Sequence, residues 1–533
     1  MKRRRFLKLS LAAVALNSAV NSCQQKRKIK GSIVGASASV GHLLRDQSFN
    51  QPTTVEQKKL VIIGGGVSGL SAARFVAKAG LSDFVVLDLE KSMGGNAASG
   101  KNEISAYPWG AHYVPIPNNV LTDYLAFLKE GGVITEFNES GLPVYNEYYL
   151  CFDAQDRLYI NGQWQEGLVP QFGVPDQEKK QVERFHQLMD EYRYKTGRDG
   201  RDAFAIPVDT SSRDKELSEL DKITMKQWLI KNGFDSHHLK WYINYCTRDD
   251  FGTTYDEVSA WAGIHYFASR KGKGVNAKAH DILTWPEGNN FLVQQLQRNL
   301  EGNLRTESLV VRVKQAESNI LIDYLDVRTR ELKRIEASQC IMAVPQFIAC
   351  RLLNDSDRSE TIRKHFHYMP WMVANLTVKD LQERSGAPLS WDNVLYESES
   401  LGYVEASHQL VQGSIPRKNL TYYLPLTKNS VAEERKAAQK KTHEEWVRVI
   451  VDDLRKVHPN IEDAMQEVNV MIWGHAMVQP LPGLIHGALR PGLSQSINNK
   501  VHFAHTDLAG ISIFEEGFYQ GLNAAKKVMD LLS

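Results

Sequence analysis

Three glycines follow directly after the apolar run from Leu60 to Ile63, and their spacing is that of a phosphate-binding turn. Gly64, Gly66 and Gly69 form a G-x-G-x-x-G pattern. The first permits a tight turn, the second lets the backbone approach a pyrophosphate, and the third lets a helix pack on the strand. Asp88 ends the next apolar run, where a carboxylate can accept a hydrogen bond from a ribose hydroxyl. This order of strand, turn, helix, strand and acid predicts a dinucleotide-binding site.

The chain begins with a sequence that is typical of an exported protein. Arg3 to Lys8 match the twin-arginine export pattern, although a general secretory signal is the alternative. The apolar run from Leu9 to Val20 is too short to span a bilayer, which needs about 20 apolar residues. Val20 to Cys23 resemble a lipobox, in which Cys23 becomes the lipidated first residue; the alternative is a chance cysteine near an ordinary cleavage site. We expect residues 1–23 to be a signal peptide and the protein to be periplasmic, anchored to a membrane through Cys23.

This expected export route bears on the cofactor. The twin-arginine route carries proteins that have already folded, often with a cofactor installed. A freely exchanging nicotinamide nucleotide has no obvious supply outside the cytoplasm. A tightly held flavin dinucleotide is therefore favoured.

Length and composition indicate an ordinary globular protein. Residues 24–533 are too many for one hydrophobic core and are typical of two large domains. The chain is 42% hydrophobic and 24% charged with a net charge of +2, so nothing points to a nucleic acid partner. No C-x-x-C pair occurs, so we expect no metal site and leave disulfides open among the four remaining cysteines: Cys151, Cys246, Cys340 and Cys350.

Beyond Asp88 the chain resembles the flavin-dependent amine oxidase superfamily. Asp88 stands where that family usually has Glu, and Gly94-Gly95 match the doublet that lies along the cofactor. Asn96 stands where the family usually has Arg. The segment from Trp109 to His112 resembles the one that runs behind the flavin ring.

Later blocks match in the family's order. Val310, in the segment Leu309 to Val313, corresponds to the backbone contact with adenine, and Asp507 to a contact near the ribityl-phosphate. Glu516-Gly517 would start a helix whose amides point at the flavin carbonyl. Because no cysteine follows Cys350, the resemblance implies noncovalent FAD. The expected cofactor-binding residues are Gly64, Gly66, Ser68, Gly69, Asp88, Gly94, Gly95, Asn96, Trp109, Gly110, Ala111, His112, Val310, Asp507, Gly517 and Phe518.

The resemblance also implies the fold, which is α/β. We expect a discontinuous Rossmann-type FAD-binding domain with an α+β substrate domain inserted into it. The FAD-binding domain would comprise residues 58–115, 286–349 and 471–533, and the substrate domain residues 116–285 and 350–470. Residues 24–57 are polar and would form a tether between the lipid anchor and the folded body.

Three residues are candidates for a catalytic role. Met372 falls where many amine oxidases carry a lysine that holds a water at the reactive flavin nitrogen. Trp473 falls where the family places an active-site tryptophan; it would form an aromatic wall, or else be a core residue. His112 would be a polar group beside the flavin or the substrate, although a structural role is common for a single histidine.

The favoured reaction is oxidation of an amine by hydride transfer to the flavin, followed by hydrolysis of the imine. Oxygen or a membrane quinone would accept the electrons. One alternative is a flavin-dependent desaturase or isomerase acting on a C–C bond, and another is a non-catalytic flavin-binding lipoprotein. An acidic, aromatic pocket would favour amine oxidation, whereas an apolar tunnel would favour the C–C reaction. An NAD-dependent dehydrogenase is disfavoured by the C-terminal flavin motif and by export.

Overall fold

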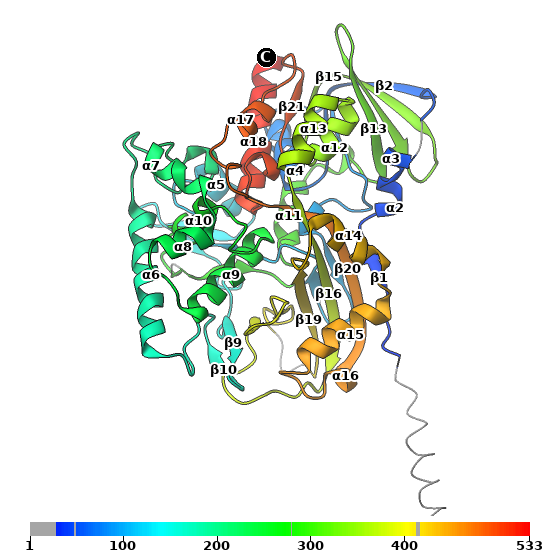
Figure 1. Ribbon diagram of the computed structural model, residues 1–533. Coiled ribbons are helices and arrows are strands. Elements are labelled where there is room, and N and C mark those ends of the chain that lie inside the picture. The colour runs from blue at the N-terminus through cyan, green and yellow to red at the C-terminus, as the bar shows by residue number, and fades with distance from the viewer. Residues whose placement is uncertain (1–27, 47–48, 279, 412–415) are drawn as a thin grey trace, which may run out of the picture.

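The computed structural model describes residues 28–46, 49–278, 280–411 and 416–533. The proposed signal peptide and Cys23 lie outside these residues. Two large sheets organise the chain, and each is accompanied by its own helices (Figure 1). The architecture is mixed α/β, which confirms the predicted fold class.

The first sheet has the strand order β12-β3-β2-β15-β14-β13, with β21 beside β15. β2 pairs in parallel with both β3 and β15. Its residues Leu60 to Ile63 are at most 3% exposed, which confirms a strand buried on both faces. The strands are β2 (Thr54–Ile63), β3 (Phe84–Leu87), β12 (Leu304–Arg305), β13 (Ser308–Gln315), β14 (Ile320–Asp326), β15 (Leu332–Met342) and β21 (Val501–Phe503).

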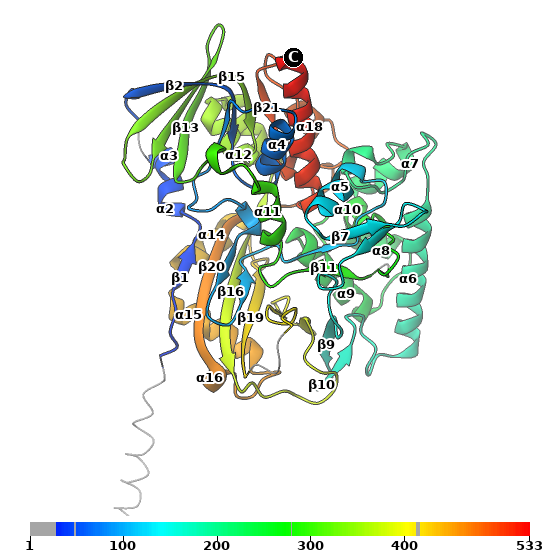
Figure 2. The ribbon, with the colours of Figure 1, turned by 180° about the vertical axis from the view of Figure 1, so that it is seen from behind.

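Two helices pack closely together beside this sheet (Figure 2). α4 (Val67–Lys78) follows the glycine turn, and α18 (Phe514–Leu532) is the C-terminal helix. α18 begins at Phe514, two residues before the predicted start at Glu516, because Ile513 occupies the N-cap position. The other helices of this part are α2 (Ala38–Gly41), α3 (Leu43–Asp46), α11 (Asn290–Gln297), α12 (Gln346–Leu353), α13 (Ser356–His365) and α17 (Leu489–Leu493).

Gly521 sets the close approach of α18 to α4, because a Cβ there would lie 1.9 Å from the Ser68 carbonyl oxygen. We expect Gly521→Ala to lower the free energy of unfolding by about 2–4 kcal/mol, since backbone would have to move. Urea unfolding followed by circular dichroism measures this. Gly302→Ala is the control, because a Cβ there meets nothing within 4 Å. Equal stability of the two variants would contradict this packing.

The second sheet has the order β1-β20-β16-β19-β18-β17-β9-β10. β16 (Tyr368–Lys379) lies inside it, and its side chains alternate between the two faces. Trp371 and Val373 join one buried cluster, whereas Met372 joins the other, together with Trp446. The other strands are β1 (Ile33–Gly35), β9 (Asp156–Ile160), β10 (Gln163–Glu166), β17 (Asp392–Leu395), β18 (Tyr403–Glu405), β19 (Arg417–Pro425) and β20 (Met465–Val478).

Helices cover one face of this second sheet (Figure 1). One face carries α14 (Val431–Lys440), α15 (His443–Leu454) and α16 (Ile461–Ala464); capping boxes at Ser430 and Thr442 start the first two. Residues on the other face, such as Trp371 and Val373, share one apolar cluster with α9 (His237–Phe251) and its neighbours α6 (Asp176–Tyr194), α7 (Lys215–Ser218), α8 (Met225–Lys231) and α10 (Ala260–Ala268).

Short elements connect the two parts. α5 (Thr122–Glu130) packs into the same apolar cluster as α4 and α18. Two-stranded pairings are formed by β4 (Ser99–Lys101) with β5 (Ala106–Pro108), β6 (Tyr113–Pro115) with β11 (Ile282–Thr284), and β7 (Ile134–Phe137) with β8 (Pro143–Tyr145). Single 3₁₀ turns are η1 (Gly95–Ala97), η2 (Val208–Thr210), η3 (Glu219–Lys222), η4 (Glu301–Asn303) and η5 (Thr506–Leu508).

Two predicted boundaries are wrong. Part of the expected tether, residues 24–57, is folded: β1 pairs in parallel with β20, and β2 already begins at Thr54. The boundary expected between 470 and 471 falls inside β20, which pairs with β16 as far as Val478. Both boundaries were misplaced because strand pairing cannot be seen in the composition of a segment. None of the helices in the described part of the chain has the length and apolarity that a membrane crossing requires.

Candidate functional site

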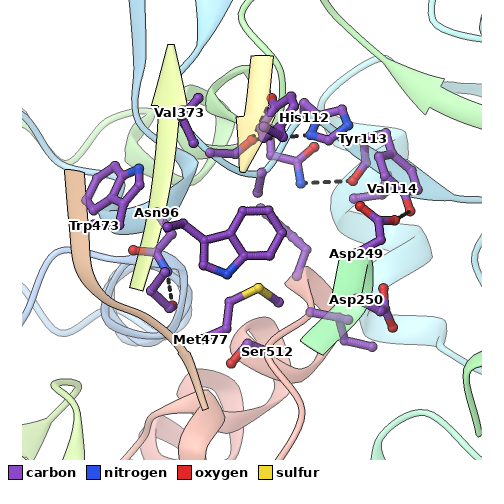
Figure 3. A pocket seen from close by; sticks show the side chains of 18 of the residues that line it. Asn96, His112, Tyr113, Val114, Asp249, Asp250, Val373, Trp473, Met477 and Ser512 are labelled. Atoms are coloured by element: carbon purple, nitrogen blue, oxygen red, sulfur yellow. Dashed lines mark hydrogen bonds between the residues drawn. The ribbon is translucent and has the colours of Figure 1, made fainter. Parts of the chain in front are cut away.

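Five residues predicted from the sequence lie around one cavity of about 150 Å³. They are Asn96, Gly110, Ala111, His112 and Trp473, and Figure 3 shows the side chains of this site. The remaining wall includes residues of β6, α9, β16, β19 and β20, and the first residues of α18. Because α18 is long and begins here, its positive end faces the cavity.

The aromatic wall of this cavity is held by hydrogen bonds to the backbone. Trp473 donates from Nε1 to the carbonyl of Trp109 at 2.6 Å. Asn96 donates its amide to the carbonyl of Ala476. Trp371, directly paired with Trp473 in the sheet, lines the cavity as well. The predicted cofactor segment is thus tied to β20 on one side of the cavity.

His112 is neutral at physiological pH. Its ring is stacked on that of Tyr423 with centroids 4.5 Å apart, and burial lowers the pKa of His112 to about 4. Its Nδ1 lies 3.3 Å from the carbonyl of Gly110, which also accepts from the Tyr423 hydroxyl at 3.0 Å. A carbonyl accepts only, so Nδ1 carries the proton and Nε2 is an acceptor.

The glycine turn leaves room for a phosphate at the start of α4. Gly64 has φ +102, a conformation that favours glycine. Gly66 is the N-cap of α4, and a Cβ built there would meet nothing within 4 Å. Nearby, Gly95 and Asn96 are exposed. Free space at a helix N-terminus, bordered by exposed backbone, fits the pyrophosphate of a dinucleotide.

The expected adenosine end lies next to this turn. Asp88 accepts hydrogen bonds from the N–H groups of Gly65 at 2.6 Å and Glu90 at 2.7 Å, and burial raises its pKa to about 6. Val310 stands at a β-bulge, where the ladder between β13 and β14 shifts register. Asp88 therefore shapes the turn, and the bulge interrupts the ladder where a backbone contact to adenine is expected. Taken together, these residues fit FAD.

The structure contradicts the predicted role of Met372, and it places Asp507 and Phe518 inside the fold. Met372 is fully buried in the cluster on the opposite face of β16, so it does not line the cavity. Asp507 is 0% exposed, and its Oδ2 accepts from the N–H of Gln346 and the hydroxyl of Tyr368, both at 2.7 Å. Phe518 packs its ring against Tyr124 in the core. The contacts of Asp507 and Phe518 with the cofactor stay predictions.

The other predicted cofactor residues lie in the surrounding backbone. Ser68 and Gly69 are buried where α4 meets the sheet and α18. Gly94 donates its N–H to the carbonyl of Gly65, which fixes the glycine doublet beside the turn. Gly517 lies in the first turns of α18, against Val67.

A larger cavity of about 660 Å³ adjoins the first, and sequence reasoning missed its acidic wall. Asp249 and Asp250, in the last turn of α9, line both cavities. Tyr113 lies with its hydroxyl 3.4 Å from the Asp249 carboxylate. Arg270 approaches Asp250 at 4.0 Å and Glu515, at the start of α18, at 3.4 Å. Figure 3 shows Asp249 and Asp250 on the side of the site opposite Trp473.

These carboxyl groups are weaker acids than usual. Burial raises the pKa of Asp249 to about 7 and that of Asp250 to about 6. Asp392, from β17, also lines the larger cavity, and burial together with the charge of Asp249 raises its pKa well above the usual value. The sequence does contain a signal for this wall. An acidic pair in the last turn of a helix is unfavourable for the helix dipole, so Asp249 and Asp250 indicate a role other than stabilising the helix.

Comparisons with known proteins agree with this architecture. The family model described as NAD(P)-binding Rossmann-like domain matches residues 62–128. A putrescine oxidase double mutant is 16% identical, with a TM-score of 0.65 over 89% of this chain and 100% of that one. Cyclohexylamine oxidase from Brevibacterium oxydans IH-35A is 15% identical, with a TM-score of 0.62 over 90% and 100%.

The same fold also serves other chemistry. The CLA-producing fatty acid isomerase from P. acnes is 16% identical, with a TM-score of 0.61 over 87% of this chain and 97% of that one. No curated protein sequence matches this chain. The chain therefore contains a Rossmann-like NAD(P)-binding domain within a fold that it shares with solved amine oxidases.

Proposed function

We propose that this protein is an FAD-dependent oxidoreductase that oxidises an amine. The observation that carries the proposal is the acidic and aromatic cavity that adjoins the predicted flavin site. Asp249 lines both cavities and is in no ion pair among the described residues, and aromatic rings of Tyr113, Trp371 and Tyr423 line the smaller cavity with it. A buried carboxylate among ring faces suits an ammonium group, because both attract cations.

The same observation weighs against the C–C alternative. The fatty acid isomerase with this fold shows that the architecture alone does not choose the reaction. An apolar substrate would have to leave Asp249 and Asp250 in contact with hydrocarbon, which is costly for groups that ionise near neutral pH. The ammonium group of an amine substrate would instead pair with these carboxylates.

FAD would be held noncovalently. Its pyrophosphate would meet Gly66 at the start of α4, its adenosine the region of Asp88 and Val310, and its ring the backbone from Gly110 to His112. When bound, FAD supplies a ring that accepts a hydride equivalent. The start of α18 would stabilise negative charge that develops there.

The side chains of this chain would prepare the amine for oxidation. Asp249 would hold the substrate's ammonium group and accept one of its protons, leaving a neutral amine whose nitrogen lone pair assists loss of hydride from the adjacent carbon. Trp473 and Tyr423 would exclude water from the reacting carbon. The product is an imine, and water hydrolyses it to a carbonyl compound and an amine or ammonia.

The electron acceptor and location are further parts of this proposal. Either oxygen or a membrane quinone would reoxidise the flavin. An anchor at Cys23 on the periplasmic side of a membrane would place the enzyme beside quinones. These two points rest on the amino-acid sequence of residues 1–23.

One experiment tests the main proposal. The purified mature protein should show the yellow absorption of bound flavin, and denaturation should release that flavin without protein attached. Under anaerobic conditions, monoamines or diamines should bleach the visible band. A protein without flavin would overturn the whole proposal, and bound flavin that no amine reduces would overturn amine oxidation.

We expect the affinity for a cationic amine to fall in acid. Because the pKa of Asp249 is raised to about 7, this carboxyl is neutral at lower pH and no longer attracts an ammonium. The Asp249 carboxyl is faced by four groups: Asp250, Asp392, Arg270 and Tyr113. The two carboxyl groups among them also become neutral in acid. KM measured from about pH 8 down to about pH 5 should rise at least about tenfold, and Asp249→Asn should flatten the profile. A flat wild-type profile would contradict this role.

The raised pKa of Asp249 has the opposite effect on the folding stability of the protein without substrate. The folded state binds a proton at Asp249 more tightly than the unfolded state does. Its contribution to stability is therefore complete below about pH 4 and is lost as the pH rises through about 7. Binding of a cation should restore stability above that pH, because it offsets the charge of the ionised carboxylate.

A further inference from the structure

The residues from Lys30 to Arg45 form a strap that joins the two large sheets. The strap begins with β1, which pairs in parallel with β20 so that Gly35 lies opposite Ile472. It continues through α2 and α3 toward the first sheet, where the carbonyl of Leu44 accepts a hydrogen bond from Arg351 at 3.2 Å. In Figures 1 and 2, α2 and α3 lie between the two sheets. The strap is therefore attached to both parts of the fold.

Two hydrogen bonds fasten the middle of the strap beside the expected adenosine end of FAD. Ser37 donates its N–H to Oε1 of Glu90 at 2.8 Å and its hydroxyl to Oε2 at 2.9 Å. Glu90 follows Asp88 by two residues and donates its own N–H to the Asp88 carboxylate. Gly41, at the end of α2, lies against Leu89, because a Cβ there would be 3.4 Å from the Leu89 side chain. Both ends of α2 therefore rest on the segment that follows β3.

The strap crosses a seam that is bordered by the predicted cofactor residues. One side of the seam is the segment from Asp88 to Asn96, and the other side is β20. Asn96 donates its amide across the seam to the carbonyl of Ala476. A Cβ at Gly95 would lie 3.4 Å from the Cα of Gly66, so the turn that is expected to meet the pyrophosphate borders the same seam. FAD bound to these residues would lie along the seam that the strap crosses.

The strap is packed loosely enough to open by itself. Every residue from Lys30 to Arg45 is at least partly exposed, and β1 is the edge strand of its sheet. Val34 and Leu44 pack against buried clusters, yet both remain partly exposed. Segments with few buried apolar contacts and exposed hydrogen bonds open at a lower free energy than the whole protein unfolds. The strap can therefore open while both sheets stay folded.

We propose that this strap is a gate for the cofactor, which opens for FAD to enter or leave and is otherwise closed over the seam. The inference rests on the FAD binding of the proposed function and is independent of amine oxidation. The bonds between Ser37 and Glu90 hold the gate closed at α2. Gly31 holds it at β1, since its φ is +127 and a Cβ there would lie 1.7 Å from the Val468 carbonyl oxygen. Closure slows entry and release alike, which suits a flavin that is installed once, before export.

The test measures the rate constants of FAD association with the apoprotein and of FAD release from the holoprotein, both by flavin fluorescence. Ser37→Ala removes one of the two bonds to Glu90, so both rate constants should rise about fivefold. Gly31→Ala combined with Ser37→Ala also displaces β1, and both rate constants should rise about 10- to 100-fold. Because FAD passes the same gate in both directions, Kd should stay within about threefold of the wild-type value. The rate of flavin reduction at saturating amine should stay within about twofold.

Thr442→Ala is the matched control, because Thr442 donates the same pair of hydrogen bonds to a glutamate, from its N–H to Glu445 at 2.7 Å and from its hydroxyl at 3.0 Å. It lies at the start of α15 and should leave both rate constants unchanged. Circular dichroism confirms that each variant is folded, and Ser37→Ala alone decides if the double variant is not.

Two results would overturn the gate. Faster release with unchanged association would mean that the strap touches FAD without controlling its path. Unchanged rate constants in a folded variant would mean that the strap only joins the sheets. Neither result bears on amine oxidation, whereas a wild-type protein that binds no FAD would overturn the proposed function itself.

Discussion

Asp249→Asn should slow the reduction of bound flavin by its best amine by about 100-fold or more. The substitution removes the carboxylate that borders both cavities and is in no ion pair among the described residues. It abolishes the ion pair with the substrate and the acceptor for its proton, and general base catalysis alone contributes about 10²–10⁴-fold. Anaerobic stopped-flow reduction measures the rate at saturating and limiting amine.

Asp250→Asn is the matched control for this experiment. Asp250 is the next residue in α9 and lines the same cavities, but Arg270 already lies beside it. We expect a loss of about tenfold or less, since Arg270 keeps Glu515 as a partner. Reduction of Asp249→Asn at the wild-type rate would show that another group binds the amine. Equal losses in both variants would assign the effect to overall negative charge.

Gly66→Ala should produce a folded protein that has lost its flavin. Gly66 has φ −76 and ψ −174, which any residue can adopt, and a Cβ there meets nothing within 4 Å. The methyl group would occupy the space in which the pyrophosphate approaches the backbone. We expect the affinity for FAD to fall about 100-fold or more, measured by flavin fluorescence after dialysis, with little change in the melting temperature of the apoprotein.

Gly69→Ala separates this effect from misfolding. A Cβ at Gly69 would lie 1.8 Å from the carbonyl oxygen of Gly64, so this variant should lose stability as well as flavin. A stable Gly66→Ala protein that binds FAD as tightly as the wild type would mean that the pyrophosphate lies elsewhere. Destabilisation equal to that of Gly69→Ala would mean that Gly66 serves packing.

Local patterns in the sequence were sufficient for the nucleotide-binding part. The apolar run Leu60 to Ile63, the glycines after it and the acid at Asp88 are close in sequence and act through neighbouring backbone. The structure confirms the buried strand and the helix that follows it. The structure also brings Asn96, the segment from Gly110 to His112, and Trp473 together around one cavity.

Predictions failed where they depended on which way a side chain points. In β16 a shift of one residue moves a side chain to the other face, so Trp371 and Val373 line the cavity while Met372 packs under α15. The hydrogen bonds that Asp507 accepts from Gln346 and Tyr368 likewise depend on tertiary contacts that the motif does not show. Sequence spacing alone does not determine such a register.

The sequence by itself therefore determined an α/β chain with a dinucleotide turn, because those signals are local and periodic. Only the tertiary structure decided the character of the second cavity. Asp249 comes from the end of α9, Asp392 from β17 and Asp156 from β9, and each is an ordinary acid in its own segment. They line one cavity only because the second sheet and α9 bring them together, and burial there changes their acidity.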